Sequence, residues 1–297
     1  MPPIHYSTFP VRFYECDAYG HLNNAVYLRY MQEAAFDASA ALGFGAQEYR
    51  RLGRAWLARL SEIQYLRPVR YGDTVIVATW VKDFKRVRSL RAYEMRLQGS
   101  EDPVAKGWTD WVFVDTSSGR PVSIPREIAK TYLPEGSIEA VSINRRFTSH
   151  PEPSPYVYVD RRKVEWQDLD PAQHVNNAMY LSYLVEAAWR FGEVIQWNWE
   201  RMSSSGFGVW ARKHQIEYLL PAVYGDELEI TTWLSGARRS TISRHYTIRR
   251  VEDGELLARA SSLYVCVDLS SGSPQRIPTD FLEDARVYIS TTPADGG

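Results

Sequence analysis

The sequence has few of the features that would set it apart from an ordinary globular protein. It contains two cysteines, Cys16 and Cys266, too few for a disulfide framework or a four-cysteine zinc site. No run approaches the ~18 apolar residues that a membrane span needs, and residues 1–5 lack the basic and apolar regions of a signal peptide. We therefore expect a cytoplasmic protein without a membrane span, whose cysteines act as small buried apolar side chains.

Net charge is also almost absent. Lys and Arg together number 35 and Asp and Glu 36, a formal net charge of -1, which provides no general attraction to nucleic acid. Hydrophobic residues make up 44% of the 297 residues and aromatic residues 13%, enough to form a folded core. At about 150 residues per domain, this length suggests two domains.

The chain contains an internal repeat with an offset of 153 residues. Residues 11–128 align without a gap on residues 164–281, with 38 identities in 118 positions. We interpret the chain as two fused copies of one domain. Three prolines in residues 148–155 indicate a stiff, extended linker, so we place the copies at 1–147 and 157–297 and the linker at 148–156.

Each copy has the pattern of one long helix and about five antiparallel strands, an α+β unit. Apolar residues recur at helical spacing after residue 23, and Gly43 is a natural helix end. Asn23 or Asn24 is a natural N-cap for this helix, and the second copy's helix is expected to begin near Asn176 or Asn177. Strands are expected at residues 74–80, 104–114, 227–234 and 256–267.

A polar cluster at the helix start is the strongest functional candidate. Residues 17–35 hold 11 of the identities in 19 positions, and they include Asp17, His21, Asn23 and Asn24. The second copy has the same residue types at the same spacing, at Asp170, His174, Asn176 and Asn177. Unpaired N–H groups at a helix start can stabilise an oxyanion, while a nearby carboxylate acts as nucleophile or general base. The alternative is structural: Asp and Asn also cap helices and complement their dipoles.

At these residues the sequence resembles a known family. Residues 15–24, ECDAYGHLNN, and 168–177, DLDPAQHVNN, resemble the active-site segment of hotdog-fold thioesterases. The similarity is to the 4-hydroxybenzoyl-CoA thioesterase family and its long-chain acyl-CoA relatives, in which Asp-x-x-Gly-His-x-Asn-Asn precedes the central helix. The second copy is also similar to plant acyl-ACP thioesterases, but Ala172 stands where those proteins have Asn, and Gln173 stands where the first copy has Gly20.

The resemblance implies a tandem double hotdog, in which each unit is a long helix wrapped by an antiparallel sheet. It also implies two pseudo-equivalent sites at the interface of the units. The catalytic acids would be Asp17 and Asp170, and the N–H groups near Asn24 and Asn177 would polarise the thioester carbonyl. His21 and His174 would bind substrate, orient the loop or shuttle a proton. Such hydrolysis needs neither a metal nor an organic cofactor.

Further residues are candidates for substrate binding. Arg86, Arg88 and Arg239 can contact the phosphates of a CoA-type substrate, although arginines on a solvent-facing strand would show the same pattern. Tyr27 and Tyr180 can line an acyl pocket or can pack in the core with a bonded hydroxyl. The cap residues Asn23 and Asn176 complete this set.

The sequence thus predicts an enzyme that hydrolyses acyl-CoA to a free acid and CoA, as a possible homo-oligomer of the double-hotdog unit. The first alternative is a thioesterase acting on acyl carrier protein, and the second is a non-catalytic acyl-CoA-binding module. The spacing of four residues between Asp and His disfavours hotdog hydratases, which resemble Asp-x-Asn-x-x-His. A Ser-His-Asp hydrolase is disfavoured because no Gly-x-Ser-x-Gly elbow occurs.

Overall fold

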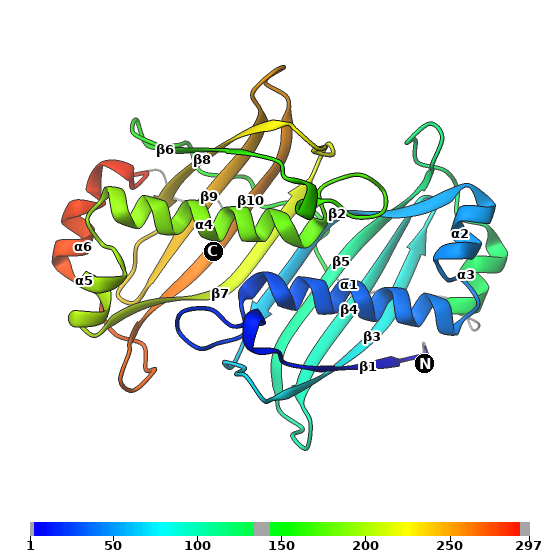
Figure 1. Ribbon diagram of the computed structural model, residues 1–297, viewed down its shortest axis with the longest axis horizontal. Helices are drawn as coiled ribbons and strands as arrows, with labels where there is room; N and C mark the ends of the chain where they lie inside the picture. Colours follow the sequence, from blue (N-terminus) through cyan, green and yellow to red (C-terminus); the bar gives the residue numbers. More distant parts are fainter. Residues whose placement is uncertain (1–2, 134–142, 292–297) are drawn as a thin grey trace. The chain divides into compact units, whose positions relative to one another are not determined.

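A long helix packed on a five-stranded antiparallel sheet forms each half of the chain (Figure 1). The computed structural model describes residues 3–133 and 143–291. The chain divides into unit 1, residues 1–146, and unit 2, residues 147–297.

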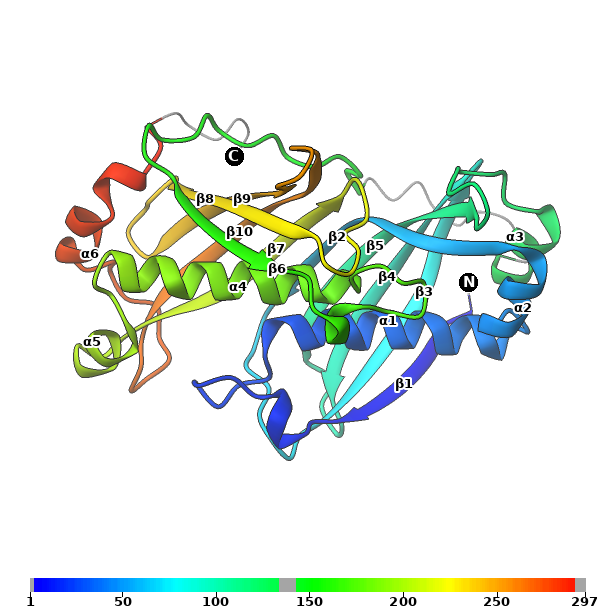
Figure 2. The ribbon, with the colours of Figure 1, turned by 45° about the horizontal axis from the view of Figure 1, so that its top comes forward.

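Unit 1 follows the expected order of strand, helix and further strands. Its strands are β1 (His5–Pro10), β2 (Arg54–Tyr65), β3 (Thr74–Lys85), β4 (Arg88–Leu97) and β5 (Pro103–Asp115), in the spatial order β1-β3-β4-β5-β2. Its helices are η1 (Phe13–Glu15), α1 (Asn24–Ala41), α2 (Ala46–Leu52) and α3 (Arg126–Tyr132). Figure 2 shows α1 running along one face of this sheet.

Unit 2 repeats this arrangement. Its strands are β6 (Tyr158–Lys163), β7 (Phe207–Tyr218), β8 (Glu227–Ser235), β9 (Thr241–Arg250) and β10 (Leu256–Asp268), in the order β6-β8-β9-β10-β7. Its helices are η2 (Trp166–Asp168), α4 (Asn177–Val194), α5 (Trp199–Ser204), α6 (Thr279–Asp284) and η3 (Arg286–Tyr288). The α+β architecture expected from the sequence is confirmed in both units. The four strands expected from the sequence are present, two in each unit.

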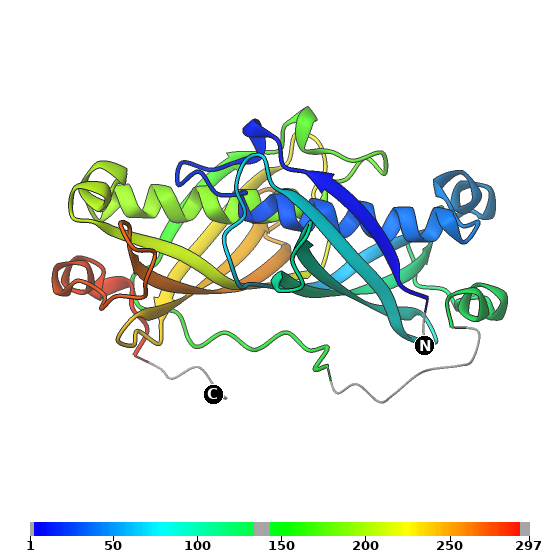
Figure 3. The ribbon, with the colours of Figure 1, turned by 90° about the horizontal axis from the view of Figure 1, so that it is seen from below.

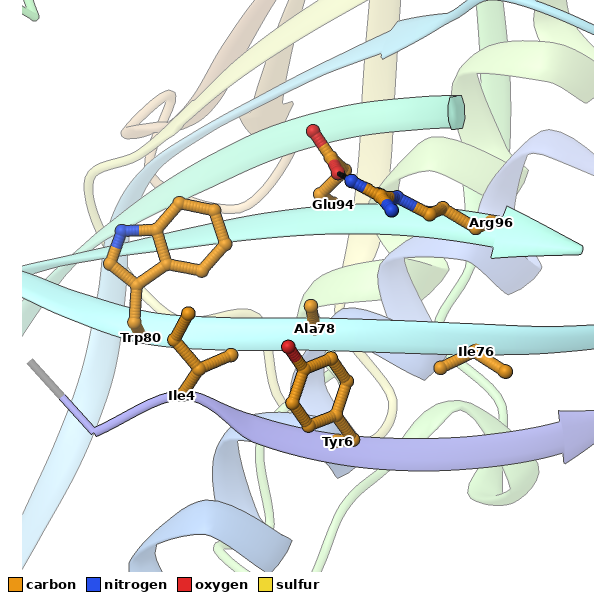
Figure 4. Close-up of a pocket in the computed structure, with 7 residues that line it drawn as sticks. All are labelled: Ile4, Tyr6, Ile76, Ala78, Trp80, Glu94 and Arg96. Carbon is orange, nitrogen blue, oxygen red and sulfur yellow. Dashed lines mark hydrogen bonds and ion pairs between the residues drawn. The ribbon is translucent and has the colours of Figure 1, made fainter. Parts of the chain in front are cut away.

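Successive side chains along a strand point to opposite faces of the sheet, and the fully buried set marks the face that meets the helix. In β3, Val75 and Val77 are fully buried, while Ile76 and Ala78 point to the opposite face (Figure 4). On β5, a Cβ added to Gly107 would lie 2.8 Å from the carbonyl oxygen of Glu62 on β2 and 3.0 Å from the Met31 side chain of α1. Glycine at this position therefore permits the close approach of the β2 backbone and of α1.

The segment 148–156, expected from its prolines to be a linker, contains no helix or strand and lies against unit 2. Figure 3 shows it on the face of the unit 2 sheet opposite α4. A ring nitrogen of His150, Nε2, is 3.0 Å from the carbonyl oxygen of Ala260, and the Ser154 hydroxyl donates to the carbonyl of Val287. These contacts attach the segment along its length rather than at its ends alone.

The structure differs from the sequence expectation in two details. Four short helices, α2, α3, α5 and α6, were not anticipated, because six or seven residues are too few to show a helical period. Of the two free cysteines, Cys266 is buried as expected, whereas Cys16 is only half-buried. Within residues 3–133 and 143–291, no helix has the length and apolar character required to cross a membrane.

Candidate active site

The loop that connects β1 to α1 folds around Asp17. The Asp17 N–H donates to the carbonyl of His21 at 2.7 Å, and the Gly20 N–H donates back to the carbonyl of Asp17 at 2.9 Å. The Asp17 side chain accepts hydrogen bonds at Oδ1 from the N–H groups of Tyr19 and His21, at 2.9 and 3.1 Å. Its other oxygen, Oδ2, accepts no hydrogen bond from the part of unit 1 that the structure describes, and it is therefore the atom available for chemistry.

Unit 2 builds the same loop around Asp170. The Asp170 N–H donates to the carbonyl of His174 at 2.9 Å, and Oδ1 accepts from the Ala172 N–H at 2.8 Å. The residue in the left-handed conformation differs between the loops: Gly20 has φ of 73°, and its counterpart Gln173 adopts φ of 64°. A side chain in this left-handed region costs about 1–2 kcal/mol, so unit 2 retains the turn despite its strain.

The helix start follows directly from this loop. Asn23 is the N-cap of α1, and its side chain accepts from the Ala25 N–H at 3.0 Å. Asn176 caps α4 in the same way through the Ala178 N–H. Among the described residues, the N–H of Asn24 finds no acceptor, so one donor at the positive end of the helix dipole remains open.

Burial shifts the titration of both polar residues in the unit 1 loop. It raises the pKa of the Asp17 carboxyl above its usual value, while the hydrogen bonds from the backbone N–H groups of His21 and Tyr19 act in the opposite direction. Burial also lowers the pKa of the His21 ring, against the influence of the Asp17 charge. The ring of His21 is therefore neutral near pH 7 and can accept a proton there.

Tyr65 and Tyr218 support the helix start and were not identified from the sequence. The hydroxyl of Tyr65 donates to the backbone carbonyl of Asn24 at 3.1 Å, and that of Tyr218 donates to the backbone carbonyl of Asn177 at 3.0 Å. They are equivalent residues of a segment that the repeat preserves, residues 63–68 in unit 1 and 216–221 in unit 2, and this identity was the available signal. Each tyrosine fixes the first turn that carries the open N–H.

Tyr27 and Tyr180 are buried in the cores of their units, each at 3% exposure. The Tyr180 hydroxyl accepts from the Ala222 N–H at 3.1 Å, and burial raises the pKa of Tyr180 to about 12. Their rings stand edge-on to Tyr65 and Tyr218, with centroids 5.1 and 5.4 Å apart. These contacts correspond to core packing, one of the two roles that the sequence suggests for the two tyrosines.

The arginines expected to meet phosphates lie in different surroundings. Arg88 forms an ion pair with Asp110, a carboxylate with 0% exposure that also pairs with Arg145 at 3.5 Å. Its guanidinium therefore already has a buried anionic partner. Arg86 and Arg239 are exposed, and each is in a turn that joins two strands of its own unit, β3 to β4 and β8 to β9.

Their neighbours Arg91 and Arg244 are buried and do not belong to a solvent-facing strand surface. Arg91 donates to the Thr79 hydroxyl at 3.3 Å. Arg244 lies over the Phe191 ring at 4.3 Å. Both contacts belong to the core between helix and sheet.

One cavity of unit 1 lies away from this loop (Figure 4). It is lined by Ile4, Tyr6, Ile76, Ala78, Trp80, Glu94 and Arg96, which lie on the sheet face opposite α1. Glu94 and Arg96 pair with each other at 2.5 Å, so the cavity offers an apolar surface and no reactive group. Within the described ranges, no cluster of three or more His, Cys, Asp or Glu residues could hold a metal ion.

The chain belongs to the thioesterase-like superfamily. The model of this family matches the chain twice, over residues 11–131 and residues 164–284. Both matches include the loop and the helix start described above, and the two-fold match agrees with the repeat seen in the sequence.

Individual relatives divide between two kinds of thioesterase. The long-chain acyl-CoA thioesterase FadM of Escherichia coli is 33% identical over 112 residues, which are 37% of this chain and 82% of FadM. A palmitoyl-acyl carrier protein thioesterase of Gossypium hirsutum is 26% identical over 195 residues, 61% of this chain and 46% of that protein. The chain thus matches about half the length of this plant relative.

Solved structures share the fold over most of the chain. A putative oleoyl thioesterase from Lactobacillus plantarum has a TM-score of 0.77 at 19% identity, covering 89% of this chain and 96% of its own. A 12:0-ACP thioesterase from Umbellularia californica has a TM-score of 0.70 at 20% identity, covering 88% and 93%. The fold of the chain is therefore the tandem hotdog fold that the sequence predicts.

Proposed function

We propose that this chain hydrolyses acyl-CoA thioesters to a free carboxylic acid and CoA, using the loop and helix start of each unit. The observation that carries the proposal is the combination, in unit 1, of a carboxylate oxygen available for chemistry with an open N–H at the start of a long helix. This combination is what attack on a thioester carbonyl requires. Unit 2 repeats the loop and the capped helix start.

The residues have distinct roles in the proposed reaction. The carboxylate of Asp17 either attacks the thioester carbonyl, giving a mixed anhydride that water hydrolyses after CoA has left, or removes the proton from a water that itself attacks the carbonyl. The negative charge on the carbonyl oxygen is stabilised by the N–H of Asn24 and the helix dipole. The C–S bond then breaks, and the CoA thiolate takes up a proton, for which the neutral ring of His21 offers a relay. Asp170, Asn177 and His174 correspond in unit 2.

Two observations support CoA over acyl carrier protein as the carrier of the acyl group. The FadM relative, an acyl-CoA thioesterase by name, is matched over 82% of its length. Ala172 stands where the plant-type acyl-ACP pattern has Asn. The extended match to the Gossypium hirsutum relative keeps acyl carrier protein as the second candidate. The exposed Arg86 and Arg239 are the arginines we propose to contact the phosphates of CoA.

The test is thiol release from octanoyl-CoA, palmitoyl-CoA, benzoyl-CoA and an acyl carrier protein thioester. We expect the wild type to release CoA, and D17N and D170N each to lose part of the rate. The double variant should lose about 10²-fold or more, while D102N, which changes an exposed carboxylate, should keep the full rate.

Each other outcome has a definite meaning. Undiminished hydrolysis by the double variant would contradict the roles given to the two aspartates. Cleavage of the carrier-protein thioester alone would establish the second candidate. Acyl-CoA binding without hydrolysis by the wild type would show a binding module.

A further inference from the structure

A carboxylate two residues before Asp17 connects the loop to the helix. The Glu15 side chain accepts at Oε2 from the Tyr30 hydroxyl on the second turn of α1, at 2.8 Å. The same oxygen accepts from the Arg12 N–H at 2.8 Å, and the Glu15 carbonyl accepts from the N–H of the cap residue Asn23 at 2.9 Å. Glu15 therefore binds the chain before the loop, the N-cap and the helix together.

Unit 2 makes the same three contacts with a shorter acid. The Tyr183 hydroxyl donates to Oδ2 of Asp168 at 2.7 Å, and the Glu165 N–H donates to the same oxygen at 2.9 Å. The N–H of Asn176 donates to the Asp168 carbonyl at 2.9 Å. Asp168 is 1% exposed, so the tyrosine hydroxyl meets a desolvated carboxylate, where a hydrogen bond is strong.

The residue that covers each tyrosine ring differs between the units. In unit 1, Phe9 of β1 stacks on Tyr30, with ring centroids 4.5 Å apart and planes at 9°. In unit 2, the corresponding residue is Arg162 of β6, whose guanidinium lies 3.7 Å from the centre of the Tyr183 ring. The acid and the covering residue have both changed, yet the hydroxyl-to-carboxylate bond is present in each unit.

We infer that Glu15 with Tyr30, and Asp168 with Tyr183, are positioning pairs for the reaction proposed above, on which this inference rests. Each pair holds the loop that carries the catalytic aspartate at a fixed distance from the open N–H at the helix start. A rigid chain connects these groups, because the acid bonds to the cap through its backbone and to the helix through its side chain. Misplacement of reacting groups by about 1 Å costs on the order of 10²-fold in rate.

The experiment uses Y30F in a D170N background and Y183F in a D17N background, so that one site is measured at a time. Each substitution removes the hydroxyl and keeps the ring. The matched controls are Y49F and Y264F, which remove tyrosine hydroxyls that bond to other tyrosines, Tyr132 and Tyr246, elsewhere in the same units. We expect kcat for the best CoA ester of the panel to fall about ten- to a hundredfold in Y30F and Y183F, with KM little changed and with full kcat in the controls.

A second measurement does not depend on hydrolysis. Amide hydrogen exchange of residues 15–24 should speed up in Y30F relative to Y49F, because the bond that orders the loop is lost. Equal exchange in Y30F and Y49F, or equal kcat in an active enzyme, would overturn the positioning role. A wild type that cleaves no thioester would instead contradict the proposed function, while the exchange result would still decide whether the pair orders the loop.

Discussion

His150 stands edge-on against Trp233, with ring centroids 5.1 Å apart and planes at 90°. His150 comes from the segment before β6, and Trp233 lies on β8 of the same unit. The ring of His245 is a third member of this group, 5.1 Å from His150. Two imidazoles and an indole thus share one buried surface on which the segment is held.

This group should make the protein sensitive to acid. Burial lowers the pKa of His150 to about 4 and that of His245 to about 3, each from a usual 6.5. Between these values and pH 6.5, both rings are neutral in the folded chain and take up protons on unfolding. The stability they contribute is therefore complete above pH 6.5 and is lost as the pH falls toward their folded pKa values.

The expected loss is up to about 1.4 kcal/mol per pH unit for each histidine. Urea unfolding measured across this pH range checks it. H150L, which removes one of the titrating rings, should give a shallower pH dependence than the wild type. An unchanged slope in that variant would show that His150 takes up no proton on unfolding.

The N-cap asparagines should contribute to stability and to activity together. We expect N23A and N176A each to cost about 1 kcal/mol of unfolding free energy, because the first-turn N–H loses its acceptor. They should also lower kcat about tenfold or more, since the helix start carries the oxyanion donor. N198A removes a similar cap from α5, far along the chain from either loop. It should cost comparable stability without lowering kcat, and a parallel loss of activity there would contradict a specific role for the other two caps.

The pH dependence of hydrolysis should reflect the environment of Asp17. Because the reaction needs the ionised carboxylate and burial raises its pKa, kcat/KM of the D170N variant should fall with decreasing pH at a midpoint above 3.8, the usual value for Asp. A profile between about pH 3 and pH 8 measures this midpoint. A midpoint at or below 3.8 would mean that the rate does not follow the carboxylate as the structure presents it.

The buried carboxylate of Asp110 should be among the most sensitive positions of unit 1. D110N removes the charge that Arg88 and Arg145 share, and breaking such a pair typically costs about 3–5 kcal/mol. We expect about 3 kcal/mol, because the Arg88 side chain is 36% exposed and water partly screens its charge. Urea unfolding followed by tryptophan fluorescence measures the cost. R51A, which breaks an exposed pair with Glu48, should leave the free energy of unfolding almost unchanged.

The repeat accounts for most of what could be predicted from the sequence. It predicts two units, and in each of them the helical spacing of apolar residues and the Asn-Asn pair place the helix start within one residue. Only the choice between Asn23 and Asn24 as the cap required the structure, since both side chains can accept the same kind of hydrogen bond. The cluster of Asp17, His21 and Asn24 is local in sequence, so it could be recognised before any fold was known.

The contacts that sequence reasoning missed are the non-local ones. Glu15 and Tyr30 are fifteen residues apart and meet only because the loop turns back onto the helix. Arg88 and Asp110 meet because β4 pairs with β5 in a register that composition and periodicity do not specify. For the same reason, sequence reasoning could treat Arg88 as a surface cation, whereas in the folded sheet it pairs with the buried carboxylate of Asp110.

The exchange of Phe9 for Arg162 gives the two units different sensitivities to salt. A stacked pair of neutral rings is unaffected by dissolved ions, whereas a guanidinium that faces a ring beside a carboxylate is partly screened by them. Raising the ionic strength should therefore loosen the contact on Tyr183 and leave the contact on Tyr30 unchanged. The equivalent tyrosine is thus held by dispersion in unit 1 and by charge in unit 2.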